Sequence, residues 1–149
     1  MNGDNNFCPE LVEGRVAADR HAIHNVIEAT NLFSERVKLS KRDAVHLRIV
    51  VEELFTNILK HGRLPPSSFV EYRLERRGNL ANIEISDQGI PFDPRQDLPD
   101  KPNSDHGGEG GQGWPLIMSW CRIAGYRNAS GRNQLHLVLP LEDVARQNC

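Results

Sequence analysis

The sequence predicts an α+β domain built as a two-layer α/β sandwich, in which helices cover one face of a mostly antiparallel, mixed sheet. Three observations indicate this fold class. Apolar residues recur at helical spacing in two early segments, short turns join two pairs of alternating segments, and the elements run helix, helix, strand, strand, loop, helix, strand, strand. Short turns between consecutive strands favour antiparallel pairing, which leaves the helices to pack on one face.

Length and composition fit one such domain. The 149 residues are 38% hydrophobic and 26% charged, and 18 Lys and Arg stand against 20 Asp and Glu. A chain of this size can bury roughly 70% of its unfolded surface, which is enough for one core. The formal net charge of −2 gives no basic field, so direct nucleic-acid binding is not expected. Composition excludes disordered, collagen-like and disulfide-rich classes and does not name a function.

No feature of the chain directs it to a membrane or out of the cell. The longest apolar runs, residues 49–51 and 137–139, are far shorter than a membrane span, and residues 1–6 lack the basic and apolar regions of a signal peptide. The cysteines are odd in number and scattered, at Cys8, Cys121 and Cys149. A disulfide framework is therefore not expected, and a reducing cytoplasm is the predicted location.

The first helix is expected after a polar lead-in. Residues 1–14 contain Pro9 and Gly14 and are interpreted as a flexible N-terminal segment. The folded domain is then expected over residues 15–141, with a C-terminal tail at residues 142–149. From Arg15 a helical pattern begins, whose inward positions are Ile23, Val26, Ile27, Thr30, Phe33 and Val37.

The second helix is expected over residues 41–60. Ser40 and Asp43 resemble a capping pair, in which the serine hydroxyl accepts from a free amide of the first turn. Gly62 and the prolines at 65–66 end the helix. Its core stripe has the spacing 3-4-3-4 and consists of Ala44, Leu47, Val51, Leu54 and Ile58.

The apolar period then changes to two, which predicts a hairpin. Val70, Tyr72 and Leu74 alternate with charged residues, Gly78 begins a turn, and residues 80–86 form the returning strand. Residues 87–113 are rich in Gly, Pro and Asp and are too long for a simple turn, and such a loop is usually functional or mobile.

A third helix and a second hairpin follow that loop. The helix fits residues 114–121, where Pro115 is tolerated because it lies in the first turn. Residues 123–126 and 134–140 form two strands around a turn at Ser130 and Gly131.

The second helix also carries a polar face. Val50, Glu53, Asn57 and either Lys60 or His61 are three or four residues apart, so they share a face distinct from the core stripe. A carboxylate and a carboxamide one turn apart can have different roles in one site. The carboxylate can take a proton, and the amide oxygen can bind Mg²⁺. An isolated pair with this spacing more often marks a solvated face.

Two further segments can bind a nucleotide. Asp87 follows a strand, where its carboxylate can accept from an exocyclic amine, and Gly89 allows a flat ligand to approach the backbone. Taken alone, Asp-x-Gly is more often a turn. Residues 107–113 contain five glycines in seven positions directly before a helix, and free amides at a helix N-terminus bind phosphate. A flexible linker is the alternative, but linkers seldom open directly into an apolar helix.

Together these motifs resemble the GHKL superfamily of ATP-binding domains, which includes histidine-kinase ATPase domains, gyrase-type ATPases and heat-shock-90 type chaperones. Within it, the chain is most similar to the anti-sigma factor serine/threonine-protein kinase family. The likeness rests on residues 51–62, 87–93 and 109–117, especially Asn57 followed by His61 and the run EGGQGWPLI. It extends over about residues 15–141 and implies the Bergerat-type ATP-binding fold.

For the phosphate end of the site, the resemblance implies four kinds of contact. Glu53 would be the catalytic carboxylate, and Asn57 would hold the Mg²⁺ bound to the ATP phosphates. His61, one turn further on, would border the phosphates. The glycines that would cradle them are Gly110, Gly111 and Gly113.

For the base end, the resemblance implies that Asp87 receives the adenine amino group and that Gly89 makes room for the ring. Residues 94–109 would form the ATP lid. Two positions depart from the family pattern. Where the final strand often carries Thr near the adenine, this chain has Asn-Gln-Leu at 133–135, so Gln134 is expected to substitute. Pro115 is unusual in the helix after the glycine loop.

The resemblance implies an ATP- and Mg²⁺-dependent protein serine/threonine kinase that acts as an anti-sigma factor. Such a protein phosphorylates a small anti-anti-sigma partner, sequesters a sigma factor and can form a homodimer, with no direct contact to nucleic acid or membrane. Two alternatives stay open. One is a switch-type serine kinase that acts on a scaffold protein, and the other is a non-catalytic, nucleotide-gated module that binds a partner.

Overall fold

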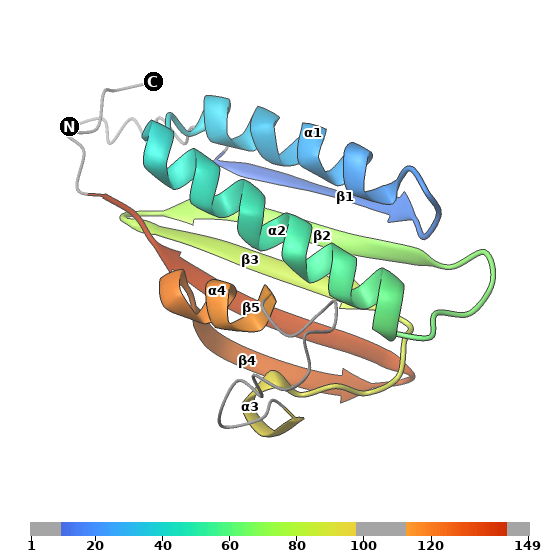
Figure 1. Ribbon diagram of the computed structural model, residues 1–149. Helices are drawn as coiled ribbons and strands as arrows, with labels where there is room; N and C mark the ends of the chain where they lie inside the picture. The colour runs from blue at the N-terminus through green and yellow to red at the C-terminus, as the bar shows by residue number, and fades with distance from the viewer. Residues whose placement is uncertain (1–9, 98–112, 143–149) are drawn as a thin grey trace, which may run out of the picture.

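A computed structural model of the protein describes residues 10–97 and 113–142. Within these residues one antiparallel sheet has the strand order β1-β2-β3-β5-β4, and α1, α2 and α4 lie side by side across one of its faces (Figure 1). The elements are β1 (Leu11–Ala17), α1 (Ala22–Arg36), α2 (Lys41–His61), β2 (Phe69–Arg77), β3 (Leu80–Asp87), α3 (Pro94–Asp97), α4 (Gly113–Trp120), β4 (Arg122–Ala129) and β5 (Arg132–Pro140).

This arrangement confirms the predicted two-layer α+β fold with helices on one face. All four strand pairings in the described chain are antiparallel, so the parallel pair of a mixed sheet is not found there. The core lies between the sheet and the helices, and its largest fully buried side chains include Phe33, Phe55 and Leu47. None of the helices in residues 10–97 and 113–142 is long and apolar enough to cross a membrane.

The N-terminal strand β1 corrects the sequence analysis, which placed residues 1–14 in a lead-in and began a helix at Arg15. Residues 11–17 instead pair with β2, and α1 begins only at Ala22. The reason is the edge position of β1, where Val16 is the one buried residue while Glu13, Gly14 and Arg15 are exposed. An edge strand with so little burial leaves almost no period-two pattern in the sequence.

Helix α2 follows its predicted bounds closely, from Lys41 to His61. The Ser40 hydroxyl oxygen accepts from the Asp43 amide over 3.1 Å, which confirms the predicted cap. The buried face of α2 is wider than predicted, because Val50 and Phe55 are fully buried as well. Val50 therefore belongs to the core and not to the polar face on which it was placed. The extra burial arises because α2 packs against α1 and α4 as well as against the sheet.

Both predicted hairpins form, β2–β3 and β4–β5. Gly78 turns the first with a φ of 59°, and Ser130 and Gly131 turn the second with φ values of 55° and 75°. Consecutive residues with positive φ give a turn whose twist matches that of the flanking strands. Helix α4 begins at Gly113, which places Pro115 in its first turn as predicted.

Candidate functional site

Helix α2 presents Glu53 and Asn57 to the first residue of α4. Both side chains are half-buried, and Gly113 lies directly against them. A methyl group added at Gly113 would lie 2.6 Å from Oε2 of Glu53 and 3.4 Å from Nδ2 of Asn57. The carboxylate, the carboxamide and the N-terminus of an apolar helix therefore meet at one point, where free backbone amides and the helix dipole favour an anion.

The Asn57 amide fits a role in binding a ligand. Its Nδ2 atom is buried and has no hydrogen-bond partner among the described residues. A buried amide without a partner is unfavourable by about 1–3 kcal/mol, so such a group in a native site calls for an explanation. Rotating the amide by half a turn would bring Oδ1 to the same place, and an amide oxygen is a ligand that Mg²⁺ accepts.

The donor set at this point is small. No three His, Cys, Asp or Glu side chains gather around a metal-sized position in the described chain. Magnesium prefers about six oxygen ligands, so Glu53 and Asn57 can supply only a minority of them. The residues present therefore fit a Mg²⁺ ion that shares its coordination with phosphate oxygens and water.

The segment that follows β3 passes beside the C-terminal end of α2 (Figure 1). The Gly89 amide donates to Oδ1 of Asp87 over 2.7 Å, and the Ile90 amide donates to the carbonyl of Gly62 over 2.8 Å. A methyl group at Gly89 would lie 2.5 Å from that carbonyl oxygen. Glycine is required here because the loop backbone packs directly on the end of the helix.

Asn133 is a site residue that the sequence analysis missed. The register of β3 and β5 pairs Asp87 with Asn133, and the buried Asn133 amide donates to Oδ1 of Asp87 over 3.0 Å. Gln134, which was expected in this place, is exposed on the other face, where its Oε1 accepts from Nη2 of Arg127 over 2.7 Å. The expectation for Gln134 is wrong because successive residues of a strand point to opposite faces. The one available signal was the pair Asn128 and Asn133 flanking the turn.

Two aromatic rings connect the two halves of the site. Phe92, in the segment after β3, and Trp114, the second residue of α4, have ring centroids 6.0 Å apart and tilted by 36°. Trp114 is buried, whereas Phe92 and Ile90 are partly exposed. The segment that carries Asp87 is thus fixed both to the end of α2 and to the start of α4.

Beside these rings, Asp93 and Arg95 form a local ion pair at the surface. Nη2 of Arg95 donates to Oδ2 of Asp93 over 2.9 Å, and this hydrogen bond lowers the pKa of Asp93. Asp93 therefore remains ionised at neutral pH and holds the first turn of α3 together.

The structure describes only some of the remaining residues that were predicted for the site. His61 is the last residue of α2, is exposed, and precedes the glycine on which Gly89 packs. Its assignment to the phosphate end stays a prediction. Gly110 and Gly111 lie outside the described residues, as does the proposed lid from residue 98 onward.

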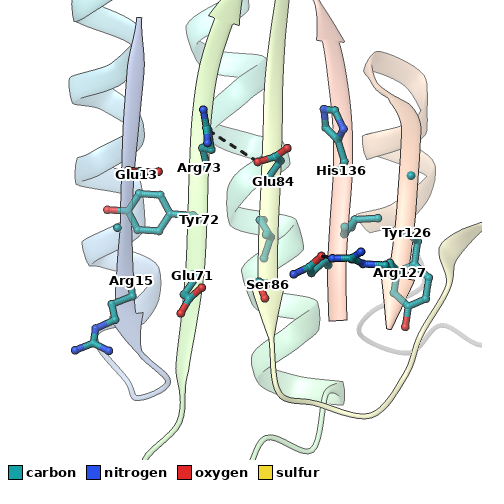
Figure 2. Close-up of a pocket in the computed structure, with 15 residues that line it drawn as sticks. Glu13, Arg15, Glu71, Tyr72, Arg73, Glu84, Ser86, Tyr126, Arg127 and His136 are labelled. Carbon is teal, nitrogen blue, oxygen red and sulfur yellow. Dashed lines mark hydrogen bonds and ion pairs between the residues drawn. The ribbon is translucent and has the colours of Figure 1, made fainter. Parts of the chain in front are cut away.

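A separate, shallow hollow of about 740 Å³ lies on the open face of the sheet, opposite the helices (Figure 2). All five strands line it, and one ion pair between its lining residues in the described chain joins Nε of Arg73 to Oε2 of Glu84 over 4.0 Å. Gln134 lines this hollow, and none of the other residues predicted for the site does so. The candidate site is therefore on the helical side, at the ends of β3 and β5.

A comparison with known protein families gives a match over most of the chain. The sequence profile of the family described as "Histidine kinase-like ATPase domain" matches residues 11–139, which run from β1 to β5. No curated protein sequence matches the chain.

Solved structures are similar in fold at low sequence identity. The chain resembles the structure of the RsbU and RsbW domains of Rv1364c from Mycobacterium tuberculosis, with 15% identity and a TM-score of 0.60, over 93% of this chain and 34% of that one. It also resembles the Acinetobacter baumannii histidine kinase AdeS, with 15% identity and a TM-score of 0.50, over 87% of this chain and 68% of that one. The chain thus spans about a third of the first of these proteins.

Proposed function

The chain belongs to the family of histidine kinase-like (GHKL) ATPase domains, and we propose that it is an ATP- and Mg²⁺-dependent protein serine/threonine kinase that acts as an anti-sigma factor. The observation that carries the proposal is the contact of Gly113 with Glu53 and Asn57. It brings a carboxylate, a buried amide and a helix N-terminus together at the point where phosphates would bind.

In this proposal the site has two ends. At the base end, Asp87 accepts from the adenine amino group and Gly89 leaves room for the ring. At the phosphate end, the amide of Gly113 would bind phosphate oxygens, and Gly110, Gly111 and His61 would take part in holding them. Both ends lie along the C-terminal half of α2, where Glu53 precedes Gly62 by about two and a half turns and Asn57 precedes it by about one and a half turns.

The proposed chemistry depends on positioning and charge. ATP would be the source of the γ-phosphoryl group, and a bound Mg²⁺ would supply neutralisation of the charge on its oxygens. Asn57 would hold the metal on the nucleotide through its amide oxygen. Glu53 would orient or deprotonate the acceptor hydroxyl, a role that general bases fill with rate factors of about 10²–10⁴.

The proposed acceptor is a serine or threonine on a small anti-anti-sigma protein, and the proposed binding partner is a sigma factor. Support comes from the resemblance of residues 51–62, 87–93 and 109–117 to the anti-sigma kinase family, and from the fold shared with a chain that contains an RsbW domain. The near-neutral charge is consistent with action on transcription through a protein rather than through DNA.

Incubation with γ-labelled ATP, Mg²⁺ and candidate small partner proteins tests the proposal. Label on a serine or threonine of the partner is the expected result. ATP binding without transfer would indicate the nucleotide-gated module instead, and label retained on this chain would indicate autophosphorylation. A purified chain that does not bind ATP at all would contradict each of these functions.

A further inference from the structure

The buried side chain of Asn133 joins β5 to the segment that carries Asp87. Its Nδ2 group donates to three acceptors, which are Oδ1 of Asp87 at 3.0 Å, the carbonyl of Ile90 at 2.9 Å and the carbonyl of Gly89 at 3.2 Å. One amide group thus fixes the carboxylate and two backbone carbonyls beside it. Three acceptors around one group are more than its two hydrogens can satisfy fully, so the donor is strongly held in place.

The orientation of this amide is determined by its neighbours. On the opposite side, Oδ1 of Asn133 accepts from the Tyr126 hydroxyl at 2.5 Å and from Nδ2 of Asn128 at 3.0 Å. The Tyr126 oxygen in turn accepts from the amide of Phe92 at 3.0 Å. A flipped amide would place donor against donor and acceptor against acceptor, so only one orientation satisfies the network. A continuous relay therefore leads from Phe92 through Tyr126 and Asn133 to Asp87.

This relay leaves one oxygen of Asp87 for a ligand. Oδ1 receives both the Gly89 amide and the Asn133 amide, whereas Oδ2 has no hydrogen bond to any residue in the described chain. Because Oδ1 is held from two directions, the plane of the carboxylate is fixed before a ligand arrives. A fixed acceptor discriminates strongly between ligands with and without a matching donor, since a mismatch leaves a buried polar group unpaired.

We propose that Asn133 is a positioning residue that sets the preference of the site for a purine with an exocyclic amino group. It acts through Asp87, which would touch the amino group, and the hydroxyl of Tyr126 supports it. The inference rests on the proposed function, because it requires that the base of a nucleotide lies against Asp87. It adds to that function a residue outside the matched motifs and states what that residue selects.

The test compares ATP with purine riboside triphosphate, which has the same ring and phosphates but no amino group. Affinities of both are measured in Mg²⁺ for the wild-type chain and for Asn133→Ala, Tyr126→Phe and Gln134→Ala. The wild type is expected to prefer ATP by about tenfold or more. Asn133→Ala should lose most of that preference by weakening ATP alone, and Tyr126→Phe should lose a smaller part of it. Gln134→Ala is the matched control, because Gln134 is the next residue of the same strand, is exposed on the other face and contacts Arg127 instead of Asp87, so this variant should keep the preference.

The outcomes separate the inference from its premise. Equal loss of both nucleotides in Asn133→Ala and Tyr126→Phe, or an unchanged preference in both, would overturn the positioning role while the proposed function stands. A wild-type chain that binds neither nucleotide would overturn the proposed function, and the inference with it. Tyr126→Phe removes one hydroxyl at a partly exposed position, so it gives an answer even where Asn133→Ala does not fold.

Discussion

Gly113 at the start of α4 lies so close to Glu53 on α2 that a single added methyl group would come within 2.6 Å of the carboxylate. Its φ is not in the left-handed region, so alanine fits the backbone, and alanine is a better helix former by up to about 1 kcal/mol. Gly113→Ala should therefore leave the free energy of unfolding unchanged or slightly raised while it displaces Glu53. We expect phosphoryl transfer to fall by about 10²-fold, because small displacements of a catalytic group have effects of this size.

Gly125→Ala is the control for this substitution, since no atom lies within 4 Å of the added methyl group. Urea unfolding of both variants measures the free energy of unfolding, and their phosphoryl-transfer rates measure the effect on activity. Full activity in Gly113→Ala would show that the contact with Glu53 has no catalytic importance.

Glu53→Gln keeps the shape of the side chain and removes its charge. If Glu53 orients or deprotonates the acceptor hydroxyl, transfer should fall by about 10²–10⁴-fold while ATP affinity changes little. The neighbouring Glu52→Gln, on a different face of the same helix, should remain active. Near-normal transfer by Glu53→Gln would remove the catalytic assignment, whereas lost ATP binding would indicate a structural role.

Ser40→Ala tests the cap of the helix that carries the site. The serine oxygen accepts from the Asp43 amide over 3.1 Å, and loss of such a cap typically lowers the free energy of unfolding by about 1 kcal/mol. Ser119→Ala, at an exposed position on α4, should change it by less than about 0.5 kcal/mol. Equal changes in the free energy of unfolding for Ser40→Ala and Ser119→Ala, measured by urea unfolding, would contradict the capping role of Ser40.

The buried thiol of Cys121 should make the free energy of unfolding depend on pH in the alkaline range. Burial raises the pKa of its thiol to about 12. In the unfolded chain the thiol ionises near pH 9, so above that pH the unfolded state releases a proton that the folded state retains. Its contribution is therefore complete below pH 9 and is lost as pH rises toward 12, by at most about 1.4 kcal/mol per pH unit.

Urea unfolding from pH 7 to 10.5 measures this effect. The comparison pairs the wild type with Cys121→Ala, both in a background where Cys8 and Cys149 are serine. Burial also raises the pKa of Tyr72, which acts in the same direction in both proteins and cancels in the difference. The difference in the free energy of unfolding between the wild type and Cys121→Ala should shrink as pH rises. A difference that stays constant from pH 7 to 10.5 would contradict the prediction.

The elements that the sequence predicted well are those with local signals. Helix α2 has a cap at Ser40 and a regular stripe of buried residues, and both hairpins turn at residues suited to positive φ. These signals lie within a few residues of the structure they specify. Strand β1 lacked such a signal, because only Val16 is buried there and its partner β2 lies beyond two helices.

The residues of the candidate site also differ in whether the nearby sequence identifies them. Glu53, Asn57, Asp87 and Gly113 belong to motifs that a resemblance can identify one segment at a time. The role of Asn133 depends on the register between β3 and β5, and the sequence between these strands does not fix that register. A shift of one residue would have exchanged Asn133 for Gln134, and this is the error that the sequence analysis made.

The relay from Phe92 to Asp87 has a consequence for how the protein folds. It joins residues separated by 34 and 46 positions in the chain, and Gly113 meets Glu53 from another distant segment. No single element of the described chain contains all of these contacts, so a ligand bound there would stabilise several distant segments at once. A nucleotide at a hundred times its dissociation constant would add about 2.7 kcal/mol to the stability of the whole domain. The supply of ligand would thus change the stability of the whole domain as well as the occupancy of the site.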